Sequence, residues 1–75
     1  MGEFKKIYIF NTPGHKDDEV GGYLHNETGH YIEVEFAKFR NTVKFYRVKT
    51  ERFNGELVGI FHSLADAKAE ARRKW

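Results

Sequence analysis

The sequence predicts an α+β fold, in which an antiparallel β-sheet with a meander of three to five strands packs against one C-terminal α-helix. Residues 31–39 alternate between apolar and polar side chains, as in a strand with one buried face. Turn residues separate several short segments that are rich in β-branched and aromatic side chains. An alanine-rich segment follows Ser63. A chain of 75 residues is expected to form a single domain, 1–75.

The N-terminal third predicts two strands and a hairpin loop. Residues 4–10 carry aromatic and β-branched side chains and stop at Asn-Thr-Pro-Gly, which favours a strand followed by a turn. A polar loop then leads to a short strand over residues 20–25. The segment Asn-Glu-Thr-Gly at 26–29 has the composition of a hairpin loop, with Gly29 supplying a positive φ.

The middle of the chain predicts three further strands, over residues 31–39, 43–53 and 56–61. In the first of these, the apolar side chains alternate strictly with the others. Asn54-Gly55 is the strongest short-range hairpin signal in the chain, and it predicts a two-residue type I′ turn between the last two strands.

A helix is predicted from Ser63 to Lys74. The Ser63 hydroxyl is expected to cap the helix by accepting a backbone N–H, and Asp66 suits the positive N-terminal end. Basic residues at the C-terminal end favour the negative pole of the helix dipole. An apolar stripe at helical spacing consists of Leu64, Ala67, Ala71 and Trp75.

The two-residue turn fixes a register, because opposed residues of an antiparallel pair share a face. Counting outward from the turn gives the pairs Phe53–Glu56, Arg52–Leu57, Thr50–Gly59 and Val48–Phe61. The helix is therefore expected on the face that carries Leu57, Gly59, Phe61, Val48 and Tyr46, since Gly59 allows a close approach. Placing Phe39 opposite Val43 predicts the ion pairs Glu35–Arg47 and Glu33–Lys49 on the other face, together with Tyr31, Phe39, Phe45, Val58 and Ile60.

Composition excludes several classes of protein. There is no cysteine, which removes disulfide scaffolds and thiolate zinc sites. No apolar run approaches a membrane span, and the first residues lack the apolar core of a signal peptide, so we expect a cytoplasmic protein with no membrane partner. The net charge is only +2, but residues 38–52 contain six basic side chains against Glu51 alone, a local charge of +5.

The residues carry no pattern typical of an enzyme, a cofactor or a small-molecule substrate. His15, His25 and His30 lie near carboxylates, but their spacing does not predict a metal site. His62-Ser63 is better explained by helix capping than by an activated hydroxyl. Paired carboxylates lie on an open face or in a loop, where desolvation cannot raise a pKa. We therefore expect a non-enzymatic protein without a cofactor or a bound metal.

The segment from Val58 to Ala67, Val-Gly-Ile-Phe-His-Ser-Leu-Ala-Asp-Ala, resembles the last strand and helix start of AP2-type DNA-binding domains and of the related phage integrase arm-binding domains. This resemblance implies a three-stranded antiparallel sheet on one helix, with the opposite sheet face in the DNA major groove. Carried over by position, it places Arg47 and Lys49 on the middle strand, where that family contacts DNA, with Phe45 beside them.

Two functions compete at this stage. The first is nucleic-acid (DNA) binding through the exposed sheet face, with contacts from Arg47, Lys49, Phe45, Lys44 and Arg40. The alternative is a small protein-binding regulator, such as a phage-type inhibitor of a host or defence-system enzyme, which uses the same aromatic and charged face or an edge strand.

Overall fold

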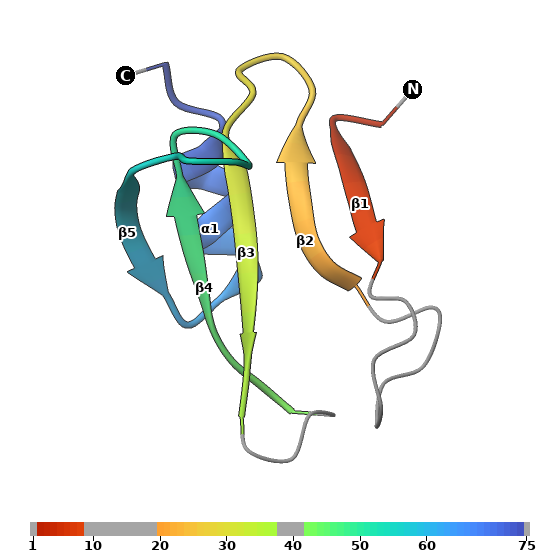
Figure 1. The fold of residues 1–75 in the computed structure, drawn as a ribbon, viewed down its shortest axis with the longest axis vertical. Coiled ribbons are helices and arrows are strands. Elements are labelled where there is room, and N and C mark those ends of the chain that lie inside the picture. Colours follow the sequence, from red (N-terminus) through yellow and green to blue (C-terminus); the bar gives the residue numbers. More distant parts are fainter. Residues whose placement is uncertain (1, 9–19, 38–41, 75) are drawn as a thin grey trace.

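The computed structural model describes residues 2–8, 20–37 and 42–74. In chain order, its elements are β1 (Phe4–Tyr8), β2 (Val20–His25), β3 (Tyr31–Phe36), β4 (Val43–Lys49), β5 (Leu57–Phe61) and α1 (Leu64–Ala71) (Figure 1).

The five strands form one antiparallel sheet in the order β1-β2-β3-β4-β5, so each strand pairs with its neighbours in sequence. Helix α1 packs on one face of this sheet and contacts β3, β4 and β5 (Figure 1). The predicted α+β class is confirmed. We call the opposite face the outer face. The described part of the chain contains no helix of the length and apolarity that a membrane crossing requires.

The core lies between α1 and the middle of the sheet. Ile32 and Val48 are fully buried, as are Ala67 and Ala71 of the helix. The small alanine side chains let the helix backbone approach the sheet closely. Partly buried apolar side chains complete this core: Phe4, Tyr23, Tyr46, Phe61 and Leu64.

The helix starts where the sequence predicts and ends earlier. Ser63 occupies the N-cap position with an extended backbone, but its side chain makes no capping hydrogen bond, so the predicted hydroxyl cap is wrong. The backbone carbonyl of Ser63 instead accepts from Ala67 N–H at 3.0 Å. The helix ends at Ala71 and does not reach Lys74. Trp75, the last residue of the predicted stripe, lies outside the described residues.

The two hairpin predictions had opposite outcomes. The loop at 26–29 is confirmed: Gly29 has φ +81° and donates its N–H to the His25 carbonyl at 2.9 Å. The type I′ turn at Asn54-Gly55 is wrong, because only Asn54 has a positive φ, +60°. Thr50 and Glu56 close a longer loop over residues 51–55, through Thr50 N–H to the Glu56 carbonyl at 3.0 Å and Glu56 N–H to the Thr50 hydroxyl at 2.9 Å.

The longer loop changes where the strands end. β4 ends at Lys49, not at residue 53, and β5 begins at Leu57. β3 ends at Phe36, and the last two residues of the predicted strand 31–39 lie outside the described residues, as do residues 9–10 of the first predicted strand.

The observed registers differ from the predicted ones by two residues. Val48 pairs with Gly59 and not with Phe61, and Arg47 pairs with Glu33 and not with Glu35. A shift of two residues preserves the face of every side chain, because side chains alternate with a period of two. The predicted helix face is therefore correct for Tyr46, Val48 and Phe61, which pack against the core.

Leu57 is the exception. A bulge in β5 pairs Leu57 with Lys49, on the outer face. Its side chain is 54% exposed, so the prediction that Leu57 faces the helix is wrong.

Candidate binding surface

The outer face contains three of the five residues predicted to bind a partner. Arg47 and Lys49 alternate with the buried Val48 along β4, and Phe45 has the same parity. Lys44 lies beside them at the irregularity where β4 pairs with the end of β3. Arg40, like the predicted surface residue Phe39, lies outside the described residues.

Arg47 is engaged by two carboxylates of β3. Its Nη1 donates to Glu35 Oε1 at 2.6 Å and to Glu33 Oε1 at 3.3 Å. The hydrogen bond to Glu35 is the main reason why the pKa of Arg47 is raised. The predicted pair Glu35–Arg47 exists, whereas the predicted pair Glu33–Lys49 is wrong because Lys49 lies opposite Tyr31. Two negative charges therefore surround the central cation of the surface.

The other cations of this surface are not neutralised in this way. Within the described ranges, Lys44, Lys49 and Arg52 form no ion pair. Lys44 Nζ and the Arg47 guanidinium lie 5.8 and 4.9 Å from the centre of the Phe45 ring. The Arg52 guanidinium lies 4.9 Å from the centre of the Phe53 ring, in the loop that joins β4 to β5. These distances fit cation–π contacts.

Tyr31 belongs to the outer face but is not available to a partner. Its side chain is only 7% exposed, and its ring lies over Gly22 of the adjacent strand, where a Cβ atom would overlap the ring and hydroxyl. Burial raises the pKa of the Tyr31 hydroxyl. The prediction that Tyr31 belongs to the exposed surface is wrong. The signal that could have corrected it is the glycine in β2, which leaves space for a large neighbour.

Three of the exposed large apolar side chains lie in β5. Ile60 pairs with Arg47 on the outer face, and Val58 has the same orientation because it precedes Gly59, which pairs with the buried Val48. The outward orientation predicted for Val58 and Ile60 is confirmed. The exposed fractions are 54% for Leu57, 40% for Val58 and 50% for Ile60. We call these three side chains the β5 patch.

Two of the candidate metal ligands have structural roles instead. The Ala71 carbonyl at the end of α1 accepts hydrogen bonds from the Thr28 hydroxyl at 3.1 Å and from His30 Nδ1 at 2.8 Å. His25 Nδ1 lies 2.8 Å from the Thr28 hydroxyl and 3.1 Å from the Thr28 backbone nitrogen, and His25 Nε2 lies 3.4 Å from Glu3 Oε2. These contacts fasten the helix end to the β2–β3 hairpin.

His15 lies outside the described residues. Among the residues that the structure does describe, no group of three histidine, aspartate or glutamate side chains is placed to hold a metal ion.

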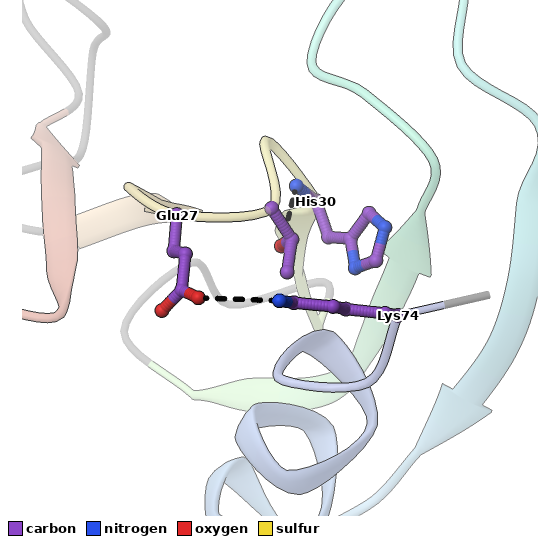
Figure 2. A pocket seen from close by; sticks show the side chains of 4 residues that line it. Glu27, His30 and Lys74 are labelled. Carbon is purple, nitrogen blue, oxygen red and sulfur yellow. Dashed lines mark hydrogen bonds and ion pairs between the residues drawn. The ribbon is translucent and has the colours of Figure 1, made fainter.

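A pocket of about 300 Å³ lies beside the same hairpin and is lined by Glu27, Thr28, His30 and Lys74 (Figure 2). Lys74 Nζ lies 3.6 Å from Glu27 Oε1, and both side chains are mostly exposed. Such pairs contribute little energy, and their charges stay solvated. His30, which is buried, is held in this lining by its hydrogen bond to the Ala71 carbonyl.

Comparisons of the chain with models of protein families, with curated proteins and with solved structures gave no significant match. The resemblance to AP2-type domains accordingly stays a prediction.

Proposed function

We propose that the protein is a non-enzymatic protein-binding module that docks an apolar, acidic surface of a partner on the β4–β5 half of its outer face. The observation that carries the proposal is the exposure of the β5 patch beside Phe45. Leu57, Val58 and Ile60 lie on the same face of one strand and each is at least 40% exposed. Adjoining exposed apolar side chains favour burial against another protein.

The charges around the patch support a partner with acidic groups. Lys49 pairs with Leu57 on the same face, and Arg52 lies in the loop at the same end of β4. Neither cation meets a carboxylate in the described part of the chain. A partner carboxylate near Leu57 would meet two cations that no described carboxylate neutralises, and such complementarity gives orientation and on-rate.

Nucleic-acid binding is the second candidate, and the same cations favour it. Lys44, Lys49 and Arg52 could each contact a phosphate. Two features weigh against it as the main function. Arg47, the central cation, is already bound by Glu33 and Glu35. The β5 patch is aliphatic, and aliphatic side chains lack the aromatic rings on which bases stack.

The test compares the capture of a partner protein by the immobilised wild type and by two matched variants. Ile60→Glu places a charge in the β5 patch, whereas Val43→Glu makes the same kind of change at a site of similar exposure on the helix side of the sheet. We expect the wild type and Val43→Glu to retain the same protein, and Ile60→Glu to lose it. Thermal unfolding of all three variants checks that each is folded.

Two results would reject the proposal. The first is retention of the captured protein by Ile60→Glu at the wild-type level. The second is capture of nucleic acid alone, released steeply by salt and lost in a variant with Lys44→Ala and Lys49→Ala, which would establish the second candidate instead.

A further inference from the structure

The two edge strands of the sheet differ in how they are protected. β1 carries Lys5 and Lys6 in its centre, and charged side chains, lysine above all, discourage other strands from pairing with an edge. β5 reads Leu-Val-Gly-Ile-Phe and contains no charged residue and no proline. It pairs with β4 on one side, and no described strand pairs with its other side (Figure 1). Its free edge is therefore open to strand addition.

The geometry of β5 sets the length of any added strand. The bulge at Val58 interrupts the ladder between Leu57 and Gly59, and the register is regular from Gly59 to Phe61. A bulge twists an edge and shortens the stretch that can pair. An added strand would be short, and its outward side chains would lie next to the β5 patch.

Charge complementarity indicates the chemistry of the added strand. At the Leu57 end, Lys49 projects on the outer face and Arg52 lies in the adjoining loop. At the opposite end, the cation of the outer face is Arg47, which pairs with Ile60 and is already bound by Glu33 and Glu35. A segment with carboxylates toward the Leu57 end and apolar side chains toward Ile60 would match this difference in charge between the two ends of β5.

We propose that the free edge of β5 takes up a short, extended, acidic segment of a partner protein as an added strand. This inference rests on the proposed function and specifies how the partner docks. Backbone hydrogen bonds to β5 provide the affinity. The β5 patch, Lys49 and Arg52 select the sequence, as in other cases of strand addition.

The test starts with a random peptide library displayed on phage and selected on the full-length protein. We expect the selected peptides to combine β-branched residues with aspartate or glutamate. Lys49→Ala should weaken their binding several-fold, whereas Lys5→Ala should leave it unchanged, because Lys5 lies on β1 at the opposite edge of the sheet. Selection of neutral or basic peptides, or equal effects of the two variants, would overturn the proposal.

Backbone N-methylation separates strand addition from docking on the face alone. Successive N–H groups of a strand point to opposite edges, so one set of alternate residues donates to β5 and the other set faces away. Methylating one set should lower affinity about tenfold for each hydrogen bond lost, and methylating the other set should change little. Strand addition is rejected if methylating neither set changes the affinity, or if methylating the two sets lowers it equally.

These outcomes distinguish the two proposals. If Ile60→Glu abolishes capture of a protein partner while N-methylation has no effect, the protein-binding face stands and strand addition fails. If no peptide is selected and no protein is captured, both proposals fail.

Discussion

The two halves of the outer face use their apolar side chains in opposite ways. Over β2 and β3, the Tyr31 ring lies over Gly22 and the side chain is 7% exposed. Over β5, Leu57 and Ile60 are about half exposed, at 54% and 50%. The first half is a small second core on the side away from the helix. The second half is a surface that remains open and offers apolar area to a partner.

Truncating one aromatic residue in each half should give the largest difference in the free energy of unfolding. Tyr31→Ala removes a nearly buried ring and should lower the free energy of unfolding by about 3 kcal/mol or more. Phe45→Ala removes a partly exposed ring from β4 and should cost less than about 1 kcal/mol. Urea unfolding of both variants measures the difference. Equal losses would mean that the two halves are equally closed.

Gly22→Ala tests the contact that closes the first half. A Cβ atom at residue 22 would overlap the Tyr31 ring, so the ring must swing away. We expect a loss of about 1–3 kcal/mol in the free energy of unfolding, typical of overpacking. The control is Gly22→Ala in a Tyr31→Ala background, where the added methyl group has no ring to displace. Additive effects in this double-mutant cycle would contradict the contact.

Ile60→Glu tests the openness of the second half. Because half of the Ile60 side chain is already in water, the substitution should change the free energy of unfolding by no more than about 0.5 kcal/mol. Chemical denaturation measures it, with Ile32→Glu on the buried face as the contrast that should fail to fold. A large loss for Ile60→Glu would show that the β5 patch is part of the core.

Glu3→Gln should have the smallest effect on stability, and that effect should depend on pH. Arg72 Nε donates to Glu3 Oε2 at 2.7 Å, and this hydrogen bond is the main reason why the pKa of Glu3 is lowered from 4.5. A lowered pKa means that the folded state favours the carboxylate, so its stabilisation is present above pH 4.5 and disappears as pH falls through the folded pKa.

The midpoint of thermal unfolding of Glu3→Gln should therefore lie slightly below that of the wild type at neutral pH. The two midpoints should converge in acid. The effect is small because both side chains are nearly half exposed and the pair is screened by water. A difference that grows as pH falls would contradict the assignment.

The wrong register predicted between β4 and β5 results from the loop that joins them. The dipeptide Asn54-Gly55 favours a two-residue turn, but the backbone of residues 50–56 closes a wider loop, in which Gly55 is needed because a Cβ there would overlap the Glu51 backbone. The sequence predicted Gly55 for a type I′ turn, whereas the structure requires glycine there because the Glu51 backbone lies close to it. Because the resulting register error is two residues, the faces of Arg47 and Val48 were still predicted correctly.

The sequence predicted on which face the candidate binding residues lie, but it did not predict which of them are free of contacts with their neighbours. Alternation along β4 placed Phe45, Arg47 and Lys49 on one side of the sheet, and the structure agrees. Whether Arg47 meets one carboxylate or two depends on the register between β3 and β4, which the alternation of side chains does not set by itself. The capping of Ala71 by Thr28 and His30 joins residues more than 40 positions apart, and no local pattern marks it.

The sequence by itself determined the class of fold, the meander of strands, the start of the helix and the face on which most strand residues lie. These depend on periods of two and 3.6 residues and on local turn chemistry, which neighbouring residues encode. The tertiary structure decided which outward side chains are closed and which are open. Tyr31 is covered because Gly22 of another strand leaves room for it, and Ile60 is open because β5 is an edge. Exposure depends on contacts between distant segments, so local pattern cannot specify it.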